Sequence, residues 1–143
     1  MTAMTVPTFE VIAAVHGRLV GHLTDITGQT VFVTDDPPAN ETFPYLVLGD
    51  ISMDDWGTKT SYGVEVMLPM TVWSAFPGTV EVAQILSAAV ACVVNGVPLT
   101  LTGYNCNTLH PDRMSVERAL DDDTQRILRK GTVLLRFLVS QNT

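Results

Sequence analysis

Two apolar segments in the first half of the chain constrain its fold more than any other feature. Residues 43–51 are apolar at almost every position, which is typical of a strand covered on both faces. Residues 62–73 alternate apolar residues with polar or small ones, the pattern of a strand with one buried face. Pro69 lies inside the second segment and removes one backbone donor, which indicates an edge or a bulge there. The two segments together predict a β-sheet.

Two helices are predicted on either side of these strands. Thr8 is the expected N-cap of the first, and its apolar stripe has spacings of three and four: Phe9, Ile12, Ala13, His16, Leu19, Val20 and Leu23. Thr79 is the expected cap of the second, whose buried stripe is Val82, Ile85, Leu86, Ala89, Val90 and Val93. The outer face of the second helix is predicted to hold mostly short, weakly polar residues: Glu81, Gln84, Ser87, Ala88 and Ala91. Asn95 and Gly96 supply its stop.

The remaining segments predict further strands joined by turns. Residues 30–33 form a short strand, residues 35–40 a loop with two prolines, and residues 52–61 an exposed hairpin loop that projects as an arm. Strands are also predicted at residues 99–106, 113–120 and 132–140, with a turn at Asp121, Asp122 and Asp123. Consecutive hairpin strands predict an α+β fold, an antiparallel β-sheet with two α-helices packed on one face.

Length and composition favour one globular domain over residues 1–143. Hydrophobic residues make up 46% of the chain and charged residues 16%, below the usual quarter. Two explanations remain open: a well-filled core, or surface that is hidden against copies or partners. No segment is long and apolar enough to span a bilayer and no secretory leader is recognised, so we expect a protein made in a cytoplasm without a membrane partner.

The net charge of −7 excludes a strongly basic nucleic-acid clamp. Residues 1–110 contain only Arg18 and Lys59 as basic residues, so most of the chain is acidic. An acidic body repels DNA. This suits simple solubility, or a conduit along which DNA slides without sticking.

Residues for catalysis or metal binding are sparse. Cys92 and Cys106 fit buried free thiols better than a disulfide framework. Cys106 with His110 is an imaginable nucleophile and base, which leaves a small cytoplasmic enzyme as an alternative. The acidic run at residues 121–123 lacks the spacing of a calcium loop and is interpreted as a solvated turn. We therefore expect no catalytic residue, no cofactor and no metal site.

Two groups of residues are candidates for an interface with other proteins. Trp56 stands in a polar segment with Asp54, Asp55 and Lys59, where a large aromatic side chain is a common anchor for a partner. The alternative is that Trp56 folds back on its own domain. A basic cluster before the last strand would pair with acidic surface on a neighbouring subunit, or would lie on a solvated arm: Arg126, Arg129 and Lys130.

The ordered set of segments resembles the tail terminator (tail completion, minor tail) proteins of long-tailed bacteriophages and of related gene transfer agents. The resemblance spans nearly the whole chain. In chain order it rests on residues 31–33 and the proline-rich loop, residues 43–49, the strand end at residues 71–74, Gly78 before the second helix, the strand at residues 113–120 with its acidic turn, and residues 126–130 leading into residues 133–139.

The resemblance implies an α+β fold that assembles into a ring, typically a hexamer. Such a ring caps the tail tube, stops its polymerisation and offers its other face to a head-side connector. It implies the major tail tube protein and a connector or stopper protein as partners, and passage of DNA without sequence readout. It places the protein in the virion tail or neck, assembled in the host cytoplasm, without catalysis. Alternatives from the residues are a stopper or adaptor ring and a ligand-binding module with a pocket between helices and sheet.

Overall fold

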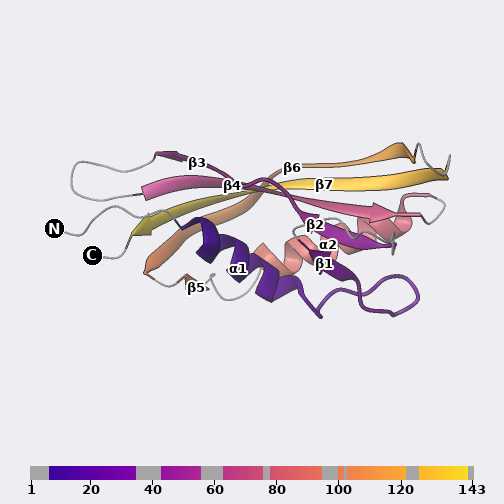
Figure 1. Ribbon diagram of the computed structural model, residues 1–143, viewed down its shortest axis with the longest axis horizontal. Coiled ribbons are helices and arrows are strands. Elements are labelled where there is room, and N and C mark those ends of the chain that lie inside the picture. The colour runs from indigo at the N-terminus through magenta and orange to yellow at the C-terminus, as the bar shows by residue number, and fades with distance from the viewer. Residues whose placement is uncertain are drawn as a thin grey trace.

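The computed structural model describes residues 7–34, 43–55, 63–75, 78–94, 100–101, 103–121 and 126–141. Within these ranges, two helices and seven strands follow one another along the chain (Figure 1). Their order is α1 (Thr8–Leu19), β1 (Phe32–Thr34), β2 (Tyr45–Leu48), β3 (Ser52–Asp55), β4 (Gly63–Ser74), α2 (Val80–Val94), β5 (Thr100–Leu101), β6 (Tyr104–Asp121) and β7 (Arg126–Gln141).

All seven strands form one mixed sheet. The strand order is β1-β2-β4-β7-β6-β5, and β3 pairs with the other half of β4. Every pairing is antiparallel except that of β1 with β2, which is parallel. The prediction of an antiparallel sheet was therefore wrong at this border. The apolar pattern of a strand carries no information on its direction relative to a neighbour, so the sequence could not reveal the parallel pair.

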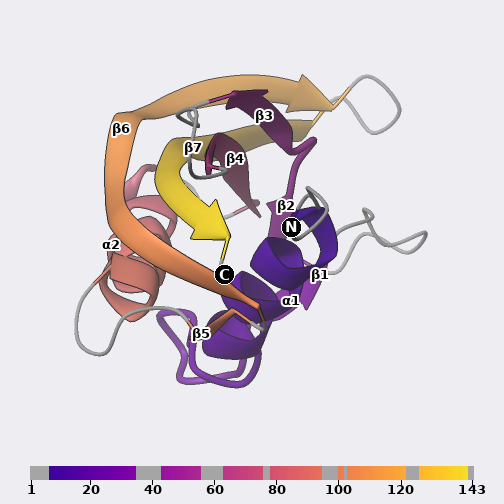
Figure 2. The ribbon, with the colours of Figure 1, turned by 90° about the vertical axis from the view of Figure 1, so that its left-hand side faces the viewer.

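The strands β4 and β7 form the centre of the sheet. Their apolar residues alternate strictly, and one face is buried from Val64 to Val72 and from Val133 to Val139. Both helices lie on this buried side, as predicted, and the sheet curves over them like half a barrel (Figures 1 and 2). The core is therefore a layer between one sheet face and two helices.

The stripe that α1 buries agrees only in part with the predicted one: Leu19, and Leu23 beyond the helix, are buried as predicted, but Val11 and Val15 were not predicted. Its buried residues are Val11, Val15 and Leu19, whereas Phe9 remains 77% exposed. The N-cap residue is Pro7, not Thr8, and no side chain caps the helix. The helix is apolar on more than one side, so two stripes with helical spacing compete and periodicity alone does not select between them.

The helix α2 confirms most of the predicted stripe, but one charged residue lies inside it. Glu81 is buried, although the sequence placed it on the outer face. Its Oε1 accepts a hydrogen bond of 2.6 Å from the Ser74 hydroxyl at the end of β4, which satisfies the carboxylate. Arg18 ties the two helices together, because its Nη1 donates to the Val93 carbonyl oxygen at 2.9 Å.

Pro69 lies neither at an edge nor at a bulge, contrary to the prediction. β4 is central, and its register with β7 runs without interruption. On its other side β4 pairs with β2 at residues 70–73 and with β3 at residues 64–67, so Pro69 faces the crossing between the two partner strands. There the Gly49 amide donates to the Pro69 carbonyl oxygen at 2.7 Å. The missing proline donor is tolerated because the ladder is already broken at this point.

Three predicted boundaries are corrected in the second half of the sheet. Residues 52–55 form β3 and not a loop, because they pair with β4. Residues 104–121 form one continuous strand instead of two. β7 begins at Arg126 and not at residue 132. The predicted loop at residues 35–40, the stop at Asn95 and Gly96, and most of the acidic turn lie outside the described residues.

Candidate assembly surfaces

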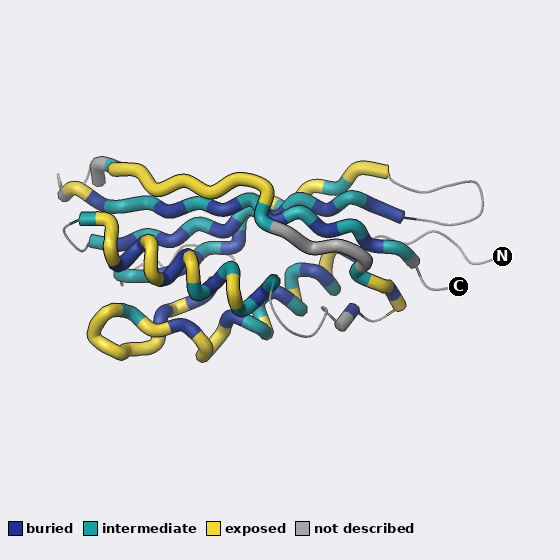
Figure 3. The backbone as a smooth tube through the Cα atoms, turned by 180° about the vertical axis from the view of Figure 1, so that it is seen from behind, coloured by how far each residue is buried: buried dark blue, intermediate teal, exposed yellow. Residues whose placement is uncertain are grey.

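The strand β6 offers a long unpaired border. Beyond the short pairing of β5 with Tyr104 and Asn105, no described strand pairs with its outer side. Every residue from 112 to 118 is exposed, including Met114 at 56% and Val116 at 38% (Figure 3). An exposed strand edge with apolar side chains is a template for pairing with another chain.

The strand β3 forms an acidic border at one end of the molecule. Asp54 and Asp55 are exposed, and they pair in register with Glu65 and Val64 of β4. The other two residues of this predicted group, Trp56 and Lys59, lie outside the described residues.

The predicted basic cluster lies on β7, within a strand and not before it. Lys130 pairs in register with Trp73, and its Nζ lies 5.4 Å from the centre of the Trp73 ring, a cation–π contact. Arg129 is half-buried, and Arg126 pairs with Asp121 through the backbone while its side chain lies outside the description. Sequence reasoning missed Trp73, although a second tryptophan at the end of an alternating strand is the signal that would have found it.

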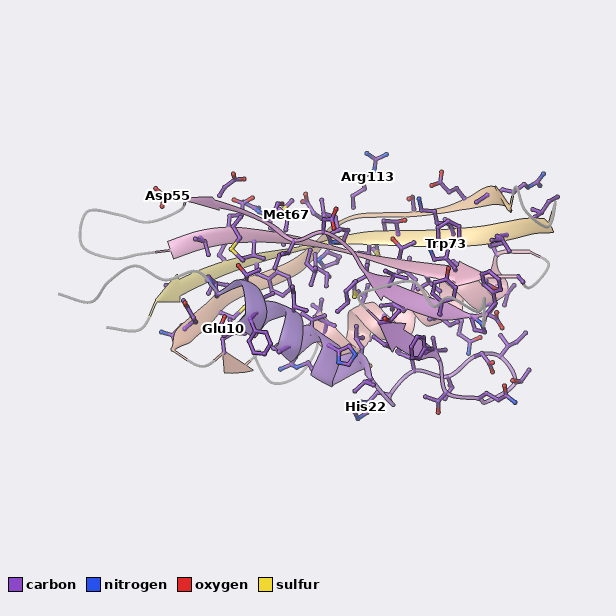
Figure 4. All side chains as sticks on the ribbon, in the orientation of Figure 1. Glu10, His22, Asp55, Met67, Trp73 and Arg113 are labelled. Carbon is purple, nitrogen blue, oxygen red and sulfur yellow. The ribbon has the colours of Figure 1, made fainter. Side chains whose placement is uncertain are left out.

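The acidic and basic groups lie at opposite ends of the sheet. Figure 4 shows Asp55 at one end of β4 and Trp73, the contact of Lys130, toward the other. The two predicted groups therefore do not form one site within a single chain. They are separate surfaces that different neighbours can contact.

The exposed residues of both helices are uncharged, and the charged residues of α1, Glu10 and Arg18, are only partly exposed. The exposed residues of α1 are Thr8, Phe9, Ala13 and Gly17. Those of α2 are Val80, Ala83, Gln84, Ser87 and Ala91. A surface helix normally places charged residues opposite its buried stripe. Exposed helix residues without charge are typical of a surface that is covered in an assembly.

An ion pair links β4 and β7 on the face of the sheet opposite the helices. Arg136 Nη2 of β7 lies 3.0 Å from Glu65 Oε2 of β4, and both side chains are about one third exposed, at 34% and 27%. The hydrogen bond from Arg136 holds the pKa of the Glu65 carboxyl below its ordinary value. This pair links two central strands on the side where no helix packs.

The candidate nucleophile Cys106 lies in a poor environment for catalysis. Burial raises the pKa of its thiol, an effect that the charge of Arg18 only partly opposes. A raised pKa disfavours the thiolate, which is the nucleophilic form. The side chain of His110 lies outside the description. Within the described ranges, no group of three acidic, histidine or cysteine side chains could hold a metal ion, and neither described helix is long and apolar enough to cross a membrane.

The chain is similar to known phage proteins over nearly its full length. Residues 13–139 match the family Tail completion protein gp17. The Tail completion protein gp17 of Bacillus phage SPP1 is 28% identical over 111 residues, which cover 77% of this chain and 78% of that protein. A chain in the solved virion of a native gene transfer agent particle is 19% identical, covers 96% of this chain and 99% of its own length, and superimposes with a TM-score of 0.75.

The match to the family covers most of the chain, and the match to the virion chain shows the same fold. The exposed border of β6 and the uncharged exposed residues of the helices agree with a protein that works by contact with other proteins. The chain belongs to the tail completion protein gp17 family, and it is a structural component of the virion tail and not an enzyme.

Proposed function

We propose that this protein is a tail terminator. Six copies form a ring that caps the tail tube, stops its polymerisation and joins the tail to the head-side connector. DNA passes through the ring without sequence readout, because an acidic chain repels phosphate instead of binding it. The observation that carries the proposal is that the exposed residues of both helices are all uncharged, in a chain that belongs to a tail completion protein family.

A ring needs two different surfaces on each copy that fit each other after a rotation. In this proposal the outer face of α1 packs against the outer face of α2 of the next copy. Ala13 and Gly17 allow a close approach, and a Cβ at Gly17 would meet no atom within 4 Å in the single chain. Uncharged residues lose little hydration when such a contact forms.

The sheet ends contact the other partners. The acidic end at Asp54 and Asp55, with the segment that contains Trp56 and Lys59, contacts the major tail tube protein. The basic group of β7, Arg126, Arg129 and Lys130, pairs with acidic surface on a neighbouring subunit or on the connector. The position of the two groups at opposite ends of β4 supports this division.

The test of the function is a phage that lacks this protein. Loss of a terminator yields overlong tails of irregular length and heads without tails, seen by electron microscopy of lysates. Tails of normal length that remain separate from heads would contradict the terminator role and would indicate a stopper or adaptor ring. Complementation with the wild-type chain restores joined particles of regular tail length.

The test of the ring uses a charge on the helix face. We expect Gly17→Glu to fold as the wild type, since the position is exposed and glutamate favours a helix over glycine. It should prevent rings on tail tubes in negative-stain images. Gln29→Glu adds the same charge at an exposed position away from both helices and should leave the rings intact. Rings of the Gly17→Glu variant that are indistinguishable from the wild type would remove α1 from the interface.

A further inference from the structure

The charged residues in the exposed part of β6 are self-complementary: when two copies of this segment lie antiparallel, positive residues face negative ones. Residues 112 to 118 read Asp-Arg-Met-Ser-Val-Glu-Arg. An antiparallel copy of this segment, centred on Ser115, places Arg113 opposite Glu117, Met114 opposite Val116 and Ser115 opposite itself. The same register places Asp112 opposite Arg118. Every pair is therefore a charge pair, an apolar pair or the serine on the two-fold axis.

We propose that two copies of this chain pair through their β6 borders about Ser115 and form a symmetric dimer. This association is separate from the proposed ring and does not depend on it. The two strands extend both sheets into one across a two-fold axis, because directly opposed residues of antiparallel strands share a face. Arg113 and Glu117 of each copy then form two equivalent ion pairs.

Arg113 and Glu117 form no ion pair within the described part of the single chain. Arg113 and Glu117 are four residues apart along one strand, about 13 Å, which is too far for a direct ion pair. The register within the sheet places Arg113 opposite Leu134 and Glu117 opposite Lys130, which lies over the Trp73 ring.

Arg118 adds a second reason for pairing. It lies directly opposite Arg129 of β7, and like charges across two strands are unfavourable. In the proposed register Arg118 faces Asp112 of the second copy, whose negative charge also acts on Arg136 of its own chain, and this opposite charge reduces the repulsion. Asp112 lies at the irregularity between Pro111 and Arg113, so the regular part of the pairing is residues 113–117.

The space beside β6 permits the pairing. Figures 1 and 3 show its exposed run along the upper border of the molecule, with no described element outside it. Both helices lie on the inner face of the sheet, where α2 contacts β6 as well as β4 and β7, so neither helix takes the place of a strand along this border. A short strand pairing buries little surface, so the dimer is of the transient class. It covers an aggregation-prone edge while the protein awaits assembly.

Charge exchange tests the register. Sedimentation of the full chain over a range of concentrations should show reversible dimers for the wild type, distinguished from a six-copy ring by mass. Arg113→Glu or Glu117→Arg alone turns both attractive pairs into repulsive ones and should weaken dimerisation about tenfold. The double variant Arg113→Glu with Glu117→Arg should restore it. An equal mixture of the two single variants should associate although neither does so alone.

A cysteine at the two-fold axis tests the geometry independently. Ser115→Cys should form a disulfide-linked dimer under mild oxidation, because Ser115 is the residue that meets its own copy. Glu117→Cys should not, and the wild type, which retains Cys92 and Cys106, controls for the native thiols. A wild type that stays monomeric at all concentrations would overturn the proposal, as would single reversals without effect or equal cross-linking at positions 115 and 117.

Discussion

The neighbouring strands β6 and β7 have similar lengths, 18 and 16 residues, but they are used in opposite ways. β7 has a neighbour on each side, and its residues 128–140 alternate between buried and half-buried positions almost without exception. β6 is exposed at every position from 112 to 118. β7 is held in place by the core, whereas residues 113–118 of β6 are held by their backbone pairing with β7. This part of β6 is therefore available to contact other proteins.

The largest expected effect is the loss of a β7 core side chain. Phe137 is fully buried at the centre of the core. We expect Phe137→Ala to lower the free energy of unfolding by about 3–5 kcal/mol, because it leaves a cavity. Met114→Ala on β6 is the matched control and should change it by less than about 0.5 kcal/mol. Urea unfolding followed by circular dichroism measures both. Equal losses of stability would contradict the view that β7 stabilises the core and the exposed part of β6 does not.

A smaller loss is expected from a methyl group added to β7. Gly131 lies under α2, and a Cβ at this position would overlap the Val82 Cγ1 and press on Leu86. We expect Gly131→Ala to destabilise the fold by about 1–3 kcal/mol through overpacking. The same measurement on Val116→Ala, whose residue pairs with Gly131 in β6, should show a smaller effect. A Gly131→Ala variant as stable as the wild type would mean that α2 can move away from β7 without a loss of stability.

A pH-dependent effect is expected from the pair between Glu65 and Arg136. Because the pKa of Glu65 is lowered in the folded state, its contribution to stability is full above the ordinary value of 4.5 and is lost as the pH falls through the lowered pKa. The melting temperature of the wild type should exceed that of Glu65→Gln at pH 7, and the difference should shrink below pH 4.5. A difference that stays constant from pH 7 to pH 3 would show that the ion pair does not cause it.

The smallest effect is expected on the exposed strand itself. Met114→Lys should leave the free energy of unfolding within about 0.5 kcal/mol of the wild type, because the side chain is 56% exposed. It should nevertheless weaken the proposed dimer, since it replaces the apolar partner of Val116. Light scattering at high concentration measures this. A strong loss of stability would place Met114 in the fold and not on a free border.

The sequence predicted the core strands better than the surfaces. The alternation in β4 and β7 and the stripe of α2 were correct, because period two and period 3.6 follow directly from which face is buried. Met114 and Val116 alternate with polar residues in the strand predicted at residues 113–120, yet both faces are exposed there. Periodicity shows that a strand has two faces, but it does not show whether another element covers either of them.

The candidate site was predicted only in part. Asp54 and Asp55 were correctly expected to be exposed, but as part of a loop and not of β3. The burial of Glu81 was missed because its partner, Ser74, lies seven residues away on another element. The absence of charge among the exposed helix residues was not visible in the sequence, because Glu81 was placed on the outer face of α2 and the buried stripe of α1 was not identified in full. Two apolar stripes compete there, and only tertiary packing decides between them.

The contact between Gly49 and Pro69 has a consequence for how this protein evolves. A Cβ at position 49 would lie 2.8 Å from the proline ring, so a larger residue is accepted there only if the ring is lost. A residue other than proline at position 69 would bring an amide hydrogen toward a place where the ladder is interrupted. Each position therefore limits the other, and substitutions at 49 and 69 are expected to appear together when homologous sequences are aligned.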